Sequence, residues 1–320
     1  MLYFFKVYGV KLQIQNIRKW NHTGDVYNLE VEDNHNYFVN NVLVSNCHGA
    51  KAVSVQDIAK KCINSDYRIG FTGTLPSEPI DKLTITGYLG PVYFEKKSDD
   101  LIKDGILSDI TIACLLIKYP QNLINYKMIE EYQDEVNFVS TNQIRNRVFD
   151  YIFSKIPDGQ NSLILVSLIE HLRLVESYLK TNLDKKYKIY IVYGGIKPED
   201  REEIRTKIEN EENVIIIATF GSYKQGINIK RLHNVIFGSS LKSEISVPQA
   251  IGRGLRTHGT KDKLILWDII DNMSEKHIIS RGPNKVKEVT KYNYMMQQFF
   301  ERLKLYKAAK FNFFSRIIEL

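Results

Sequence analysis

The stretch NSLILVS, residues 161–167, decides the fold of most of this chain. It is an apolar run of strand length, and the residues after it, IEHLRLVESYL, have the period of an amphipathic helix. The pattern recurs in IYIVYGG at 189–195, which precedes a charged helical segment, in VIIIAT at 214–219 and in NVIFGS at 234–239. Buried strands separated by helices predict a parallel sheet that is covered on both faces. The fold class is therefore α/β, and we assign residues 138–280 to this domain.

Downstream of these strands, the run QAIGRGLR carries the strongest catalytic pattern in the chain. Arg253 and Arg256 stand three residues apart, and Gln249 precedes Arg253 by four, so on a helix the three side chains share one face. Ile251 and Leu255 fall on the other face. Because a planar guanidinium suits the charge that develops on a transferred phosphoryl group, the pattern predicts catalytic arginines. The alternative is an amphipathic helix with surface arginines.

Polar residues at the ends of the apolar runs are candidate ligand contacts. Ser167 and Thr219 each end a predicted strand, and we expect them to bind nucleic acid. In the run FGSYKQGIN, Gly226 and Asn228 allow the backbone to approach phosphates closely, which favours ATP binding and its coupling to nucleic acid. Lys224 is either a phosphate contact or a solvated lysine.

The α/β pattern extends upstream to Cys47. VSVQDIAKKC has a helical repeat, and YRIGFTGT is an apolar strand that runs into a turn with two hydroxyls, Thr72 and Thr74. These hydroxyls are suited either to hydrogen bonds at an ATP site or to capping the turn. We assign residues 47–137 to a separate domain. The last residues, 281–320, are read as a helical extension, basic and rich in aromatics, that packs on the sheet domain or forms a DNA-binding arm.

Composition excludes several classes of protein. The chain has 320 residues, of which 43% are hydrophobic and 25% charged, which is ordinary for a soluble protein of two or more domains. It has no apolar run of 18 residues and no cleavable signal, so we expect a cytoplasmic protein without a membrane partner. The three cysteines have no CxxC spacing and the seven histidines no ligand spacing. Reduced thiols and no metal ligands are therefore predicted.

The net charge of +7 lies entirely after residue 46. Residues 1–46 contain four basic and four acidic side chains, whereas residues 47–320 contain 40 basic and 33 acidic ones. This excess is compatible with nucleic-acid binding, and a solvated basic surface without a partner is the alternative.

The join at Ser45-Asn46-Cys47 separates two kinds of sequence. Before it, short strand-like runs such as YNLEVE and NVLVS alternate with Asp/Asn-rich turns, which is typical of a small β structure. An Asn side-chain amide can attack its own carbonyl and cut the peptide bond, and an adjacent thiol can accept an acyl group. Although Asn-Cys is a common dipeptide, the run GDVYNLEVEDNHNYFVNNVLVSN followed by Cys resembles the C-terminal splicing blocks of inteins.

The resemblance covers residues 24–47 and implies a small all-β Hint-type fragment at 1–46. It implies that Asn46 cyclises, that Cys47 is the first extein residue and branch-point nucleophile, and that His35 assists cyclisation. Alternatively, His35 is a turn histidine satisfied by its neighbours. Two positions depart from the family pattern, Ser45 where His is common and Asn28 where Asp is frequent, so proton transfer would depend more on His35. Residues 1–23 supply no N-terminal splicing block, so we expect the C-part of a split intein; an internal Met of a longer gene would look the same.

After the join, the order CHGAK, FTGTLPS, IIIATFGSYKQGINI and QAIGRGLRTH resembles the later motifs of superfamily 2 helicases, in particular the UvsW-like phage DNA helicases. The resemblance implies RecA-like lobes, the first partial and the second complete. Of the family's Asp-Glu-x-His box, only Cys47 and His48 are present, as a remnant of motif II. Splicing to an N-terminal half that ends in Asp-Glu would rebuild the box.

No Gly-rich loop followed by Lys-Ser/Thr occurs in the sequence. The expected partners are therefore an N-terminal intein and helicase half, which supplies this loop and the Asp-Glu pair, and branched or single-stranded DNA. ATP and Mg²⁺ are expected cofactors of the assembled helicase, and the chain alone is not expected to hydrolyse ATP. The alternatives are a splicing-inactive, non-enzymatic nucleic-acid-binding module, or an RNA-directed or annealing ATPase of the same fold.

Overall fold

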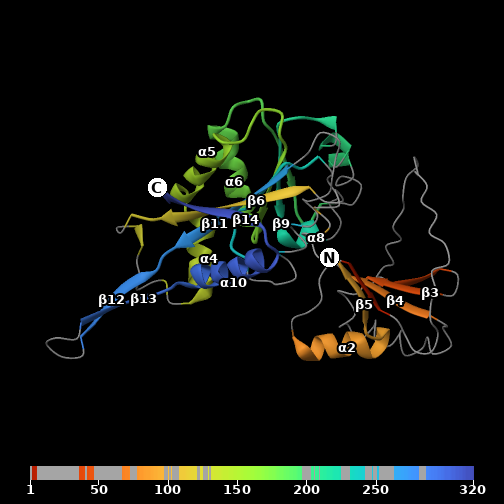
Figure 1. Ribbon diagram of the computed structural model, residues 1–320. Coiled ribbons are helices and arrows are strands. Elements are labelled where there is room, and N and C mark those ends of the chain that lie inside the picture. Colours follow the sequence, from red (N-terminus) through yellow and green to blue (C-terminus); the bar gives the residue numbers. More distant parts are fainter. Residues whose placement is uncertain are drawn as a thin grey trace. The chain divides into compact units, whose positions relative to one another are not determined.

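The structure is a computed structural model that divides the chain into two compact units, Met1–Ser98 (unit 1) and Asp99–Leu320 (unit 2). Figure 1 shows their elements. The structure describes residues 2–5, 36–39, 42–46, 67–72, 78–96, 108–120, 131–196, 210–224, 231–241, 263–280 and 286–320, with a few isolated positions between these ranges.

Unit 1 contains a mixed sheet and one described helix, α2 (Pro79–Leu89). The strand order is β2-β3-β4-β1-β5, with bounds Leu2–Phe5 for β1, Asn36–Val39 for β2, Val42–Asn46 for β3, Tyr67–Thr72 for β4 and Val92–Lys96 for β5. β2 and β3 form the antiparallel hairpin that NYFV and NVLVS predict. β3 then pairs in parallel with β4, so that Asn46 lies opposite Phe71.

The three described strands of residues 1–46 thus share a sheet with strands that follow the join. A separate all-β fragment at 1–46 remains a prediction. The predicted strand at YRIGFT is confirmed as β4. The helix expected at VSVQDIAKKC lies outside the described residues.

Unit 2 is built on a seven-stranded sheet in the order β14-β6-β11-β10-β7-β9-β8, and every neighbouring pair is parallel. Its strands are β6 (Asp109–Lys118), β7 (Ser162–Val166), β8 (Lys188–Val192), β9 (Val214–Thr219), β10 (Asn234–Phe237), β11 (Lys263–Asn272) and β14 (Asn312–Glu319). The predicted parallel α/β sheet is confirmed. The strands that NSLILVS, IYIVYGG, VIIIAT and NVIFGS predict are its β7, β8, β9 and β10.

Both faces of this sheet are buried, because successive side chains of a strand point to opposite faces. In β7, Leu163 and Leu165 belong to one core cluster and Ile164 and Val166 to the other. The first cluster includes side chains of α8 (Phe220–Lys224) and α10 (Tyr294–Ala308), and the second includes side chains of α4 (Tyr132–Thr141), α5 (Arg147–Phe153) and α6 (Ile169–Asn182). None of the helices that the structure describes is long and apolar enough to cross a membrane.

The C-terminal region differs from the expected helical extension. Within residues 286–320, which the structure describes, the helical part is Tyr294–Ala308; β13 (Val286–Lys291) precedes it, pairing with β12 (Glu275–Ser280), and β14 follows it. The helix ends where Lys310 adopts a left-handed φ of 55°, which breaks the helical repeat. The alternating residues NFFSRIIE then extend along β6. The helix packs on the sheet, with Phe299 and Tyr306 in the core.

β6 also lies in this sheet, between β11 and β14, although its residues fall in the segment 47–137 that sequence analysis set apart. Its ten residues pair with β11 along their whole length. This is why the compact unit begins at Asp99 and not at residue 138.

Candidate functional site

The carboxyl ends of three neighbouring strands bring polar side chains to one edge of the unit 2 sheet. Ser167 follows β7, Thr219 ends β9 and Ser239 follows β10, and the order β10-β7-β9 places these ends side by side. In open parallel sheets this edge is where ligands bind. Ser167 is exposed, and the Thr219 hydroxyl lies 2.7 Å from that of Ser222 in α8. The structure thus brings together two residues expected to bind nucleic acid; their binding stays a prediction.

Short hydrogen bonds hold the turn after β10 against the end of β7. The Gly238 and Ser239 amides both donate to Leu165 O, at 2.8 and 3.2 Å. A Cβ at Gly238 would lie 2.9 Å from Val166 Cγ1, closer than real Cβ contacts come, and 3.2 Å from Leu165 O, which is also tight. Glycine therefore allows the chain after β10 to lie this close to the end of β7. This close approach brings Ser239 next to Ser167, and Ser239 Oγ accepts a hydrogen bond from the Ser167 amide at 3.1 Å.

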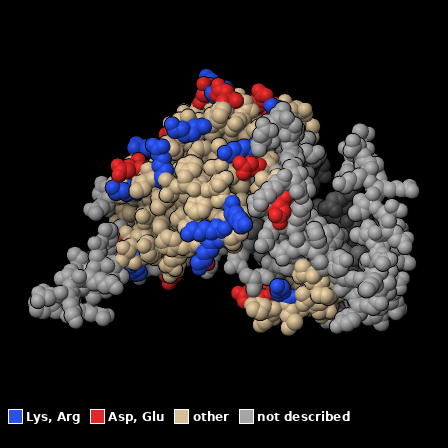
Figure 2. All heavy atoms as spheres, in the orientation of Figure 1, with Lys and Arg blue, Asp and Glu red and all other residues tan. Residues whose placement is uncertain are grey.

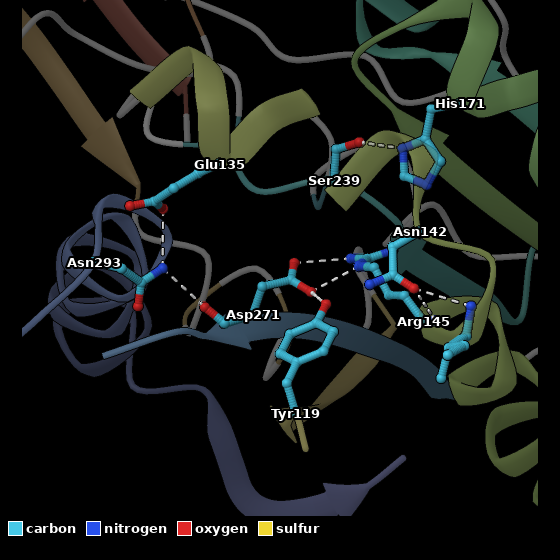
Figure 3. Close-up of polar contacts among 9 residues, drawn as sticks. Tyr119, Glu135, Asn142, Arg145, His171, Ser239, Asp271 and Asn293 are labelled. Atoms are coloured by element: carbon cyan, nitrogen blue, oxygen red, sulfur yellow. Dashed lines mark hydrogen bonds and ion pairs between the residues drawn. The ribbon is translucent and has the colours of Figure 1, made fainter. Parts of the chain in front are cut away.

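A buried imidazole supports this hydroxyl. His171 Nδ1 lies 3.0 Å from Ser239 Oγ, and His171 is 1% exposed. Figure 3 shows this contact. Burial, helped by the nearby positive charge of Arg145, lowers the pKa of His171 to about 3, so the ring is neutral near pH 7. His171 Nε2 has no hydrogen-bond partner among the described residues. A shallow groove lies over this ring; it is lined by Tyr132, Val136, Val139, Ser140, Ser167, Leu168, His171, Ser239, Ser240 and Met295.

On the side of the sheet that carries α4, α5 and α6, a fully buried ion pair joins β11 to the segment before α5. Arg145 donates to both carboxylate oxygens of Asp271, at 2.7 Å from Nε and 3.0 Å from Nη2, and Tyr119 OH donates to the same carboxylate at 2.6 Å (Figure 3). Arg145 and Asp271 are 0% exposed. Burial alone would lower the pKa of Arg145, but the facing carboxylate outweighs it and raises that pKa. The guanidinium stays charged, and the bidentate geometry fixes its orientation.

A second triad of the same kind lies three residues earlier on β11, and the odd spacing places it on the opposite face. Arg302 of α10 donates to both oxygens of Asp268, each at 2.9 Å, and Tyr306 OH donates to that carboxylate at 3.0 Å. Arg302 Nη1 also donates to Ser240 Oγ and to Leu241 O, each at 3.0 Å. Burial raises the pKa of Tyr306 well above its usual value, and the Asp268 charge adds to that rise. The phenol is therefore a permanent donor.

The start of α10 is fixed by a carboxylate from α4. Glu135 accepts hydrogen bonds from the amides of Tyr294 and Met295, at 2.7 and 2.9 Å. It also accepts one from Asn293 Nδ2 at 2.9 Å, which Figure 3 shows. A negative charge at a helix N-terminus satisfies free amides and interacts favourably with the helix dipole. Asn293 Nδ2 also donates to Asp271 O at 3.1 Å, so the cap and the Asp271 triad form one connected network.

Most other predicted site residues are not placed by this structure. Asn46, Thr72 and Lys224 are described by their backbone, as the last residues of β3, β4 and α8. The remaining ones lie outside the described residues; they are His35, Cys47, His48, Thr74, Gly226, Asn228, Gln249, Arg253 and Arg256. Val247 and Ile251, which flank Gln249, are helical and buried in the core with α10. This agrees with the expectation that Ile251 occupies the apolar face of that helix.

Sequence reasoning missed the buried polar residues around β11 and α6. A signal was present in the run LILWDIID, because two carboxylates in an apolar strand are buried only when they are paired. Their partners Arg145 and Arg302 come from segments 126 and 34 residues away, which no local pattern reveals. His171 gave no signal, since a histidine in an amphipathic helix is ordinary.

The described residues do not make up a site for ATP and Mg²⁺. Within the described part of the chain, no group of His, Cys, Asp and Glu side chains could hold a metal ion. The carboxylates of Asp268 and Asp271 form ion pairs with Arg302 and Arg145, so they are not available to bind a metal ion. Since a phosphate-binding loop is also missing from the sequence, the residues described here would not hold a nucleotide by themselves.

Basic side chains gather on one face of unit 2. Figure 2 shows a group of Lys and Arg over the region where α10 and β14 lie in Figure 1, while acidic side chains lie at the upper edge and at scattered places around this group. Exposed lysines of this region include Lys304, Lys307 and Lys310. Such a group is compatible with phosphate backbone contacts.

Comparisons with known proteins agree with this geometry. Residues 144–258 match the family Helicase conserved C-terminal domain. The chain is 27% identical over 275 residues to the ATP-dependent DNA helicase uvsW of Enterobacteria phage T4, covering 86% of this chain and 54% of that protein. The crystal structure of T4 UvsW superimposes with a TM-score of 0.53 and 25% identity, covering 86% of this chain and 53% of the other. The type ISP restriction-modification enzyme LlaBIII, bound to DNA, shares the fold alone, with a TM-score of 0.58 and 14% identity over 88% of this chain and 22% of its own.

The chain spans about half the length of the phage helicase it matches. The chain is therefore similar to the UvsW-type helicases: residues 144–258 match the helicase C-terminal domain in sequence, and the described sheet has a RecA-like α/β fold.

Proposed function

We propose that residues 47–320 are the C-terminal half of an ATP-dependent superfamily 2 DNA helicase or translocase. The observation that carries the proposal is the helicase C-terminal domain match on a RecA-like sheet. The similarity to the phage DNA helicase covers 86% of the chain, which supports a helicase origin for much more of it than residues 144–258. DNA is favoured over RNA by the name of this relative and by nothing in the geometry, since such lobes contact the phosphate backbone.

Residues 1–46 are, in this proposal, the C-terminal part of an intein that joins this half to an N-terminal half. The Cys47 thiol attacks the ester or thioester that joins the partner's extein to the partner's own Ser or Cys nucleophile; the acyl group moves to Cys47 and the partner's hydroxyl or thiol is released. The Asn46 amide nitrogen then attacks its own carbonyl carbon, the bond to Cys47 breaks as a succinimide forms, and the freed Cys47 amine takes over the acyl group as a new peptide bond. His35 would assist the proton transfers. The join would rebuild Asp-Glu-Cys-His, with Cys47 and His48 as its last residues.

In the assembled protein, ATP and Mg²⁺ would be held between the partner's phosphate-binding loop and acidic pair on one side and Gln249, Arg253 and Arg256 on the other. Thr72, Thr74, Gly226 and Asn228 would couple this site to DNA. Ser167, Thr219 and Lys224 would contact the DNA strand. The edge formed by the ends of β7, β9 and β10 supports this last assignment, because Ser167 is exposed there.

The splicing part is tested by mixing the chain with its N-terminal half and measuring intact masses. The wild type should lose residues 1–46 and gain the partner's extein. Asn46→Ala should stop cleavage after residue 46 but allow a branched intermediate, because acyl transfer to Cys47 comes first. Cys47→Ala should abolish ligation and leave cleavage possible. A ligated product from either variant would show that the junction lies elsewhere.

The same mixture tests the histidine. His35→Ala should slow splicing more than Ser45→Ala, because a serine hydroxyl does not act as an acid near neutral pH. Equal or reversed effects would place the proton relay in the partner half.

One observation favours a second candidate, a splicing-inactive module that binds nucleic acid without enzymatic activity. β3 lies parallel beside β4, so Ser45 and Asn46 end a strand next to the one that leads into FTGT. Because the resemblance places the Asp-Glu pair directly before Cys47, Ser45 and Asn46 would occupy the positions of that pair in a chain that does not splice, as inert substitutes. An unchanged mass after mixing, together with DNA binding and no ATP hydrolysis, would favour this candidate.

A further inference from the structure

The two edges of the unit 2 sheet differ in how they are protected. β8, at one edge, is five residues long, begins with Lys188 and is mostly half-buried. β14, at the other edge, is eight residues long, and residues 312–317 are all exposed. Figure 1 shows β14 beside β6, which is its pairing partner in the described part of the chain. Alternate residues of β14 therefore direct their N–H and C=O groups outward, where another strand can pair with them.

Large apolar side chains are exposed along this edge. Phe313, Phe314 and Ile317 are 39%, 49% and 64% exposed. Sheets commonly block an exposed edge with a lysine, a proline or a bulge. Residues 312–319 contain neither lysine nor proline, and their pairing with β6 runs through all eight positions without a shift. A long, regular and apolar edge of this kind is suited to pairing with another strand.

The exposed side chains of β14 are divided between the two faces of the sheet. Arg316 lies over the Tyr151 ring of α5, 5.1 Å from the ring centroid. Because successive side chains of a strand alternate, Phe314 shares the α5 face with Arg316. The side chains on the opposite face, which is the face of α10, are those of Phe313, Ser315 and Ile317.

Two copies of this strand fit together in one register. When identical strands pair antiparallel about a two-fold axis perpendicular to the sheet, opposite residues must lie on the same face, so the axis passes through a residue. With Ser315 on the axis, Phe313 of each copy lies opposite Ile317 of the other, and Phe314 lies opposite Arg316. These are an apolar pair and a cation–π pair, both favourable across strands. With Arg316 on the axis, two like charges would oppose each other.

The charges at the two ends of β14 are also complementary. Lys307 and Lys310, just before the strand, are exposed, and the Glu319 side chain at its end is 75% exposed. In the register centred on Ser315, Glu319 of one copy lies opposite Phe311 of the other, next to Lys310. The antiparallel arrangement also places the lysines of the two α10 helices at opposite ends of the paired strands, so they do not repel each other at close range.

We propose that two copies of this chain associate through β14, antiparallel about a two-fold axis at Ser315, so that their sheets join into one. The proposal goes beyond the proposed helicase function and does not depend on it. The contact is isologous, uses the open edge of both copies and leaves the two β8 edges outside, so association stops at a dimer. Because an interface of one strand from each copy is small, we expect a Kd on the order of 10 µM.

The dimer is tested by analytical ultracentrifugation of the full chain at concentrations below and above this Kd. The wild type should pass from monomer to dimer. Ser315→Lys places two ammonium groups opposite each other on the axis, and Ile317→Lys places one opposite Phe313 of the other copy; each should raise Kd by about tenfold or more. Ile169→Lys is the matched control, because this isoleucine at the start of α6 is also exposed, at 48%, and it should leave Kd within about twofold. All three positions are exposed, so Tm should stay unchanged.

The register is tested by disulfide formation between copies. Only a residue on the axis faces its own counterpart, with the Cβ atoms about 5 Å apart, close to the reach of a disulfide. Ser315→Cys should therefore give covalent dimers under mild oxidation, whereas Ile317→Cys, on the same face but four residues from its counterpart, should not. Both variants carry Cys114→Ala, because Cys114 lies beside Ser315 on β6. Mass spectrometry of the linked peptides separates this disulfide from any that involve Cys47 or Cys62.

A wild type that stays monomeric well above the expected Kd would overturn the proposal. A dimer unaffected by Ser315→Lys and Ile317→Lys would do the same, because it would use another surface, and so would covalent dimers from Ile317→Cys in place of Ser315→Cys. A monomeric chain whose binding to the N-terminal half is weakened by Ile317→Lys would show that this half, and not a second copy, occupies β14.

Discussion

At the scale of single residues, His171 makes the stability of unit 2 depend on pH. Its pKa is lowered by burial from 6.5 to about 3, so the folded state keeps the ring neutral where the unfolded chain would bind a proton. The stability that His171 contributes is therefore complete above pH 6.5 and is lost as pH falls toward 3. Between pH 6.5 and 5 the loss amounts to about 2 kcal/mol for this one proton.

His171→Gln tests this linkage. The amide keeps a partner for Ser239 Oγ but does not titrate, so urea unfolding between pH 7.5 and 5 should show a shallower loss of stability than in the wild type, by about 2 kcal/mol over that range. The other titrating groups are common to both proteins and cancel in the difference. Parallel curves for the two proteins would contradict the assignment of a neutral His171.

From the sequence, the polar residues at the strand ends could be predicted, but the buried residues that support them could not. Ser167 and Thr219 could be predicted because each ends an apolar run, and ends of parallel strands meet at one edge. His171 and the turn at Gly238 matter because Ser239 hydrogen-bonds to His171 and to Ser167. These partners lie 68 and 72 positions away in the chain. Such contacts exist only after the sheet has formed, so no local pattern contains them.

At the scale of elements, one asparagine connects the amino ends of three neighbouring strands. Asn161 lies just before β7. Its side-chain Oδ1 accepts a hydrogen bond from the Val214 amide of β9 at 3.0 Å, and its Nδ2 donates to Glu211 O at 3.0 Å. The backbone amide of Asn161 donates to His233 Nδ1 at 3.1 Å, and His233 directly precedes β10. The side chain is 0% exposed. It therefore sets the relative register of β7 and β9 with hydrogen bonds that water cannot replace.

Asn161→Ala should lower the free energy of unfolding by about 3 kcal/mol, because it leaves a buried amide and a buried carbonyl without partners. Asn182→Ala is the control: this asparagine also donates to a carbonyl, Tyr178 O at 2.9 Å, but is exposed, and its removal should cost about 0.5 kcal/mol or less. Chemical denaturation of both variants measures the difference. Equal costs would mean that Asn161 does not hold the strands.

Strands that follow a simple apolar pattern were predictable, and the others were not. β7 to β10 are continuous apolar runs with turn signals after them. β11 contains two buried aspartates that interrupt such a pattern. β14 follows an amphipathic helix without an intervening Gly or Pro, so the sequence reads as one long helix. In the structure α10 ends at Ala308, and Lys310, two residues later, has a left-handed φ. The pairing of β14 with β6 depends on residues roughly 200 positions apart, as the Lys118–Glu319 ion pair illustrates.

At the scale of the whole molecule, the proposed helicase chemistry is divided between this chain and its partner. Unit 2 has a complete parallel sheet with both faces covered, two buried Arg-Asp-Tyr triads and a match to the helicase C-terminal domain. The sequence contains the arginine pair but neither a phosphate-binding loop nor an Asp-Glu pair before Cys47-His48. Phosphoryl transfer needs both a phosphate cradle and carboxylates for Mg²⁺, so the arginines alone provide no turnover.

The most direct test of this division is DNA-stimulated ATP hydrolysis by the purified chain, measured before and after the N-terminal half is added. We predict hydrolysis at the level of a blank for the chain alone and a clear gain after mixing, which Arg253→Ala should abolish without preventing ligation. Turnover well above the blank by the chain alone would contradict the account, because it would require a nucleotide site that this sequence does not contain.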